Sequence, residues 1–131
     1  MPLDIRVTQD KDPRNSGRVR VALDGSLDTA TSPDLEKALQ PLYVRQLRVL
    51  VFDLAGLRFL SSAGIRVLMT ARKELTDHDG SFVLTNLQPQ IAKVIEIVKA
   101  LPGVSVFRND AELDAYLAAM QKKVVEGGQA G

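Results

Sequence analysis

Two adjacent serines, at a predicted junction between a strand and a helix, are the residues best suited to carry chemistry. Ser61 and Ser62 follow an apolar run and a short turn, and they precede a helix with a regular apolar face. The first turn of a helix has unsatisfied backbone N–H groups and carries the positive end of the helix dipole. A serine there either caps the helix or can carry a phosphate. Local sequence alone favours the cap, and both interpretations stay open.

Arg66 bears on the phosphate alternative because it follows Ser62 by four residues and so shares its helix face. A phosphate on Ser62 would add nearly two negative charges at pH 7, which Arg66 could pair. The helix dipole would offset about 0.3–1 kcal/mol per charge at an exposed site. We therefore expect the fold to survive modification, whereas a partner packed against Ser62 would be repelled. Gly64 is most simply a position of close packing.

Other kinds of chemistry have little support in the composition. The chain has no cysteine and one histidine, His78, so no metal site or thiol nucleophile is expected. A helix over 62–76 would place His78 about 20 Å from Ser62, beyond the reach of a general base. No glycine-rich phosphate loop ending in Lys-Ser/Thr is present. The sequence predicts a binding protein without a cofactor rather than an enzyme.

Charge and hydropathy limit the classes of partner that the protein is expected to bind. Seventeen basic and 16 acidic residues give a net charge of +1, with no block of like charge, so no nucleic-acid partner is expected. The chain lacks an apolar signal core and any run of membrane-spanning length, so we expect a cytoplasmic protein without a membrane partner. At 131 residues it is long enough for one domain.

The hydropathy periodicity alternates between that of strands and that of helices. Strands are expected at 3–8, 19–23, 47–54, 81–85 and 104–107. Helices are expected from a Ser32 cap with Pro33 at the first helical position, over 62–76, from Pro89, and from Asn109 or Asp110. This order predicts an α/β fold with a mixed, mostly parallel sheet of about five strands and about four packed helices. Residues 1–121 would form one domain and 122–131 a flexible tail.

Four segments, in order, resemble the STAS domain family, which includes bacterial anti-sigma factor antagonists. Residues 23–28 resemble its Gly-x-Leu-Asp turn, and residues 51–65 resemble its strand, turn and Ser-containing helix start. Residues 84–87 precede a proline-initiated helix, and residues 104–112 resemble the last strand and helix start. The likeness covers roughly residues 3 to 121 and implies a STAS-like fold.

The resemblance implies a protein-binding switch. In the family, the unmodified antagonist binds a partner that is both anti-sigma factor and serine kinase, and phosphorylation ends the binding. Matched on Gly64, the acceptor corresponds to Ser62, and a phosphatase would be a second partner. Asp28 would lie near Ser62 and help phosphoryl transfer or docking, although a turn acid is its commoner role. Ser61 stands where relatives often have aspartate, and this departure leaves a second function open. That alternative is a STAS interaction subunit of a signalling or lipid-transport assembly that is never phosphorylated, to which Ser61, Gly64 and Arg66 would contribute only contacts.

Overall fold

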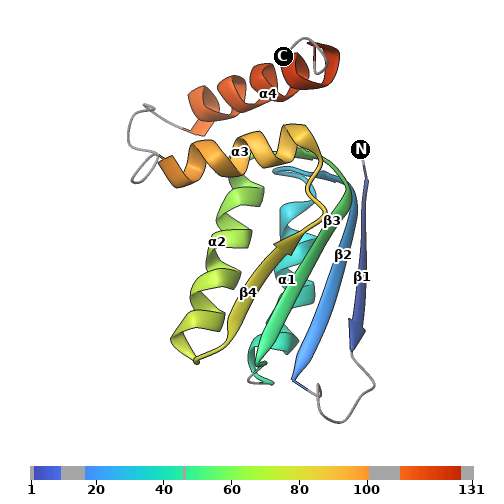
Figure 1. The fold of residues 1–131 in the computed structure, drawn as a ribbon, viewed down its shortest axis with the longest axis vertical. Helices are drawn as coiled ribbons and strands as arrows, with labels where there is room; N and C mark the ends of the chain where they lie inside the picture. The colour runs from blue at the N-terminus through green and yellow to red at the C-terminus, as the bar shows by residue number, and fades with distance from the viewer. Residues whose placement is uncertain (1, 10–16, 46, 101–109, 128–131) are drawn as a thin grey trace.

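The computed structural model describes residues 2–9, 17–45, 47–100 and 110–127 and contains four strands and four helices within them (Figure 1). The strands are β1 (Leu3–Gln9), β2 (Arg18–Leu27), β3 (Val49–Leu60) and β4 (Ser81–Thr85). The helices are α1 (Ser32–Tyr43), α2 (Ser62–Asp77), α3 (Pro89–Ala100) and α4 (Asp110–Gly127).

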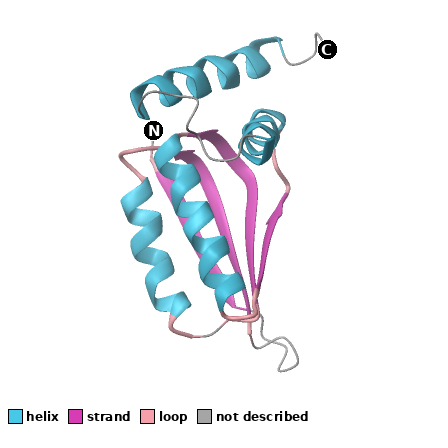
Figure 2. Ribbon diagram, turned by 90° about the vertical axis from the view of Figure 1, so that its left-hand side faces the viewer, coloured by secondary structure: helices cyan, strands magenta, loops and turns pink. Residues whose placement is uncertain are grey.

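The sheet has the mixed topology that the sequence predicts. Its strand order is β1-β2-β3-β4, with β1 antiparallel to β2 and the other neighbouring pairs parallel. Figure 2 shows α1 and α2 side by side along one face of the sheet, and α3 and α4 at one end of it. Four strands are described where about five were expected, and the expected strand at 104–107 lies outside the described residues.

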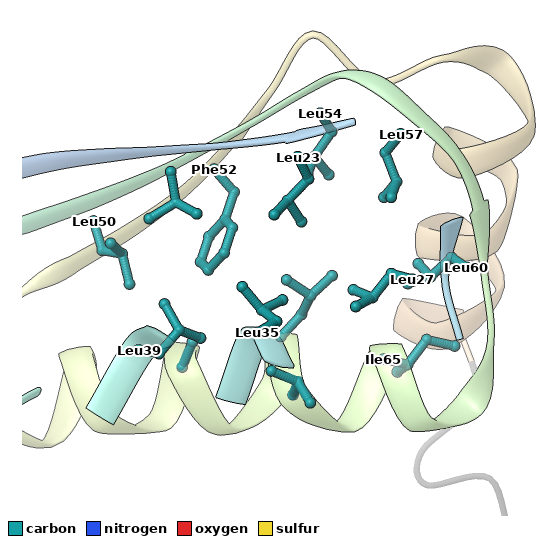
Figure 3. Packing of buried hydrophobic residues seen from close by; sticks show 14 of the residues in the cluster. Leu23, Leu27, Leu35, Leu39, Leu50, Phe52, Leu54, Leu57, Leu60 and Ile65 are labelled. Carbon is teal, nitrogen blue, oxygen red and sulfur yellow. The ribbon is translucent and has the colours of Figure 1, made fainter. Parts of the chain in front are cut away.

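The core lies between the sheet and the helices α1 and α2. Alternate residues of the strands point to this side and are fully buried, among them Leu23, Leu50, Phe52 and Leu54. Figure 3 shows them opposite side chains of the two helices, such as Leu35, Leu39 and Ile65. Burying one such side chain stabilises a fold by about 1.5–3 kcal/mol. The core therefore fixes both helices on the sheet and determines where α2 begins.

Three boundaries differ from the sequence predictions. β3 runs to Leu60 rather than ending near residue 54, because its pairing with β2 continues, through register shifts, to the pair Leu27–Leu60. The cap of α1 is Thr31 rather than Ser32, and Pro33 lies within the first two helical positions. α4 runs to Gly127, so residues 122–127 are helical rather than part of a flexible tail.

Candidate functional site

Ser61 is the N-cap of α2. Its backbone is extended, with φ −99° and ψ 175°, and its Oγ accepts a hydrogen bond from Gly64 N at 3.3 Å. Its carbonyl accepts the first intrahelical bond, from Ile65 N at 2.9 Å. Ser61 thus satisfies one of the free donors of the first turn, as a capping serine does. Of the two serines that the sequence offered as caps, the first has this role.

Ser62 is the first residue of α2, and its hydroxyl is not needed for the cap. Its backbone N–H donates to Asp114 Oδ1 of α4 at 2.9 Å. Only 3% of Ser62 is exposed. The residue therefore lies at the positive end of the helix dipole, where a negative charge is stabilised, and it is covered.

Gly64 allows α2 to approach the ends of β2 and β3 closely. A Cβ at this position would lie 2.7 Å from Leu27 Cγ, 2.8 Å from Leu60 Cδ1 and 2.9 Å from Leu27 O. These distances are shorter than real Cβ contacts, and one of them is to a backbone atom. A close-packing position was the simplest expectation for Gly64, and the geometry agrees with it.

Asp28 is part of the turn between β2 and α1, which lies beside the start of α2. Leu27 O accepts a hydrogen bond from Ser61 N at 2.9 Å, and this bond joins the two segments. Asp28 Oδ1 accepts from Ala30 N and Thr31 N, both at 3.0 Å, and from Thr31 Oγ1 at 3.1 Å. The carboxylate is thus engaged within its own turn, which is the commoner role of such an acid.

Arg66 is exposed on the side of α2 that faces α1. It lines a groove of about 380 Å³ between these helices, together with Glu36 and Tyr43. Burial, aided by the nearby carboxylates of Glu74 and Glu36, raises the pKa of Tyr43 to about 12. Of the five residues singled out from the sequence, four therefore lie together around the start of α2, and Arg66 extends the site toward α1.

Glutamines that sequence reasoning did not single out hold the far half of β3. β4 pairs with β3 only as far as Asp53, so the later backbone of β3 lacks a strand neighbour on that side. Gln88 Nε2 donates to Ala55 O at 2.7 Å, and Gln90 Nε2 donates to Arg58 O at 3.1 Å. Side-chain amides thus satisfy carbonyls that another strand would otherwise satisfy.

Gln121 of α4 makes the most complete of these contacts. Its Oε1 accepts from Leu60 N at 2.9 Å, and its Nε2 donates to Leu60 O at 2.7 Å and to Leu117 O at 3.1 Å. Only 2% of Gln121 is exposed. Asp114 and Gln121 therefore hold α4 against the end of β3 and the start of α2. A polar pair seven residues apart on a helix was the only sequence signal for this contact, and it is a weak one.

The far end of α2 holds the chain's one histidine. His78 is the C-cap of α2, and its Nδ1 lies 2.9 Å from Glu74 O. It is thus at the opposite end of the helix from Ser62, as the sequence indicated. The described residues contain no group of three or more histidine, aspartate or glutamate side chains that could hold a metal ion. In the same part of the chain, none of the helices is long and apolar enough to cross a membrane.

Comparison with known sequences assigns the family. The sequence profile of the STAS domain matches residues 10–113. BtrV of Bordetella bronchiseptica, whose name places it among the anti-sigma factor antagonists, is 33% identical over 93 residues, which cover 71% of this chain and 78% of BtrV. An anti-sigma-B factor antagonist of Listeria monocytogenes is 27% identical over 101 residues, 77% of this chain and 89% of the relative. The chain belongs to the STAS domain family.

Solved structures agree on the fold. An anti-sigma factor antagonist from Mycobacterium paratuberculosis superposes with a TM-score of 0.62 at 24% identity and covers 91% of this chain and 94% of its own. The unphosphorylated form of the antagonist SpoIIAA superposes with a TM-score of 0.60 at 18% identity, over 72% of this chain and 83% of its own. The phosphorylated form of Bacillus SpoIIAA superposes with a TM-score of 0.58 at 19% identity, over the same shares of the two chains.

Proposed function

We propose that this protein is an anti-sigma factor antagonist that binds an anti-sigma factor with serine-kinase activity, and that phosphorylation of Ser62 ends the binding. The observation that carries this proposal is the division of roles between the two serines. Ser61 caps α2, which leaves the Ser62 hydroxyl outside the capping arrangement at the positive end of the helix. The names of the relatives support the class of function.

The surface that would meet the partner surrounds the start of α2. Ser61, Gly64 and the turn that holds Asp28 are joined there by the bond between Leu27 O and Ser61 N. Gly64 draws the helix against this turn, so both segments would contact one partner together. Arg66 adds a positive charge on the side toward α1.

The proposed modification is an ordinary phosphoryl transfer. The γ-phosphoryl group of ATP bound to the kinase would pass to Ser62 Oγ, ADP would leave, and the hydroxyl proton would go to a base on the kinase or to water. The phosphate would carry nearly two negative charges at pH 7. A partner surface that packs beside the start of α2 would then face charge repulsion and desolvation. In this account the protein is the substrate of an enzyme and has no catalytic role.

Binding by Ser62 variants tests the proposal. The partners are purified anti-sigma-type serine kinases of the host. Ser62→Ala should bind them with the same affinity whether ATP is present or absent. Ser62→Asp should bind at least tenfold more weakly by titration calorimetry and keep its far-UV circular dichroism. Lys123→Ala, on the exposed side of α4, is the matched control and should bind like the natural chain.

A second candidate function is a STAS interaction subunit that is never phosphorylated. The observation that favours it is the 3% exposure of Ser62, which no kinase could use without a local opening. Equal partner affinity of Ser62→Ala and Ser62→Asp, with ATP present, would support this function and contradict the switch.

A further inference from the structure

The start of α2 is covered by α4. Figure 1 shows α4 at the end of the molecule where β3 finishes and α2 begins, beside α3. Asp114 accepts the Ser62 N–H bond at 2.9 Å, and Gln121 satisfies both backbone groups of Leu60. Ser61 and Ser62 are 4% and 3% exposed. α4 therefore contacts both the end of β3 and the first residue of α2, where the two buried serines lie.

The cover is held by few buried groups. Among the described side chains of α4, the buried ones are Leu113, Leu117 and Gln121. The other side chains described in residues 111–127 are exposed or partly exposed, among them Met120, which packs against the core, and Tyr116, which is 44% exposed. Segments with few buried apolar contacts open locally at a lower free energy than the core. We therefore expect α4 to open at a lower free energy than is needed to unfold the sheet, α1 and α2.

Asp114 and a phosphate on Ser62 would compete for the same place. The Asp114 carboxylate already lies at the positive end of α2 and accepts a hydrogen bond from its first amide. A phosphate on the adjacent Oγ would seek the same amides and the same end of the dipole. Two anions within one helical turn repel each other, since like charges in a partly buried site are poorly screened.

We propose that α4 is a cover that must leave Ser62 before the hydroxyl can be phosphorylated, and that the phosphate then keeps Asp114 from returning. The first half concerns access and stands on the contacts of α4 alone. The second half rests on the proposed function. Phosphorylation would thus change two surfaces at once, because it charges the start of α2 and releases α4.

Access to position 62 can be measured without any kinase, because the chain contains no cysteine. Ser62→Cys introduces a single thiol, whose alkylation rate by iodoacetamide reports how often the cover opens. Ala118→Cys, on the exposed side of α4, provides the unprotected reference. The Ser62→Cys thiol should react at least tenfold more slowly than the Ala118→Cys thiol in the folded protein, and equally fast in 8 M urea.

Loosening α4 should raise that rate. Gln121→Ala in the Ser62→Cys background should accelerate alkylation by at least about tenfold, because it removes both hydrogen bonds to Leu60 and one lost buried hydrogen bond alone corresponds to about that factor. This variant removes no charge, so it does not change the thiol pKa through the loss of a neighbouring charge. Asp114→Ala should also accelerate the reaction, whereas Asp114→Asn, which keeps an acceptor oxygen, should do so less. Lys123→Ala should have no effect.

The possible outcomes separate the cover from the switch. Equal alkylation of the Ser62→Cys and Ala118→Cys thiols, or no acceleration by Gln121→Ala, would overturn the cover whatever any kinase does. If Gln121→Ala lowers the far-UV circular dichroism by more than the loss of α4 alone would, more than the cover has unfolded. In that case the alkylation rates of Ser62→Cys with and without Asp114→Asn are compared instead. With a kinase, Gln121→Ala should be phosphorylated faster than the natural chain. If Gln121→Ala and the natural chain are phosphorylated at the same rate, α4 does not control access of the kinase to Ser62. If neither protein is phosphorylated, the proposed function alone is overturned.

Discussion

The contact between Gln121 and Leu60 gives the sharpest prediction for stability. Gln121 supplies an acceptor for Leu60 N, at 2.9 Å, and a donor for Leu60 O, at 2.7 Å. Gln121→Ala removes both partners at once from the buried end of β3. Each buried backbone group left unpaired costs about 1–3 kcal/mol. We expect the free energy of unfolding to fall by about 2–4 kcal/mol, a loss limited by the opening of α4, which would admit water to Leu60.

Two further variants separate hydrogen bonding from packing at the same position. Gln121→Leu keeps a side chain of similar length but neither polar group, so it should be nearly as destabilising as Gln121→Ala. Gln121→Glu keeps the acceptor for Leu60 N and loses the donor, unless its carboxyl group is protonated. Burial raises the pKa of a carboxyl group, so the stability of this variant relative to the natural chain should recover as the pH falls. Lys122→Ala, whose side chain is 73% exposed, is the matched control.

Urea unfolding followed by far-UV circular dichroism measures these differences. The reasoning would be refuted if Gln121→Leu were as stable as the natural chain to within about 0.5 kcal/mol, the usual range for a neutral surface substitution. That result would mean that apolar packing alone holds α4. Loss of stability in Lys122→Ala would instead point to a general sensitivity of α4.

Gly64→Ala should destabilise the fold, because overpacking costs about 1–3 kcal/mol and the gain in helix propensity returns only about 1 kcal/mol; urea unfolding measures the net loss, and a gain would contradict the close approach. Tyr116→Phe leaves Tyr43 as the one tyrosine of the chain. The tyrosinate absorbance of this variant should therefore rise with pH at a midpoint well above pH 10.0. Because folding raises the pKa of Tyr43, its contribution to stability is complete below pH 10 and should be lost between pH 10 and about 12; Tyr43→Phe should remove this loss. Hydrogen bonds from Asn86 and the Ala55 amide, and the Arg20 guanidinium, lower the pKa of Asp53 below 3.8. Its contribution is therefore present above that pH and lost as the pH falls through the lower folded pKa, so Asp53→Asn should show a flatter acid unfolding curve.

The parts of the fold that depend on hydropathy period could be predicted from the sequence. The alternation in β2 and the apolar face of α2 indicated the sheet and the helix that the structure contains. The start of α2 could be located to one residue, because a serine pair before an apolar helical face has few alternatives. Local sequence could not say which serine caps, and this was resolved by the bond between Gly64 N and Ser61 Oγ.

The cover over Ser62 could not be predicted, because it depends on a contact between residues far apart in the chain. Asp114 and Gln121 have no signature of their own, since polar residues on a terminal helix are normally solvated. Their role arises because β3 extends beyond its pairing with β4. The backbone groups at the end of β3 therefore lack a strand partner on that side, and a side chain satisfies them. The same reason explains the misplaced end of β3, because its extension depends on pairing with β2 rather than on a local pattern.

The measurement that tests the central claim most directly is the intact mass of the protein after incubation with ATP and an anti-sigma-type serine kinase of its host. Peptide mapping of the product would locate any phosphate, with Ser62→Ala and Ser61→Ala treated in parallel. The account predicts one phosphate, on Ser62, which is absent in Ser62→Ala and present in Ser61→Ala. A stable complex with the kinase but no phosphate, or a phosphate on another residue, would contradict the claim that Ser62 is the switch.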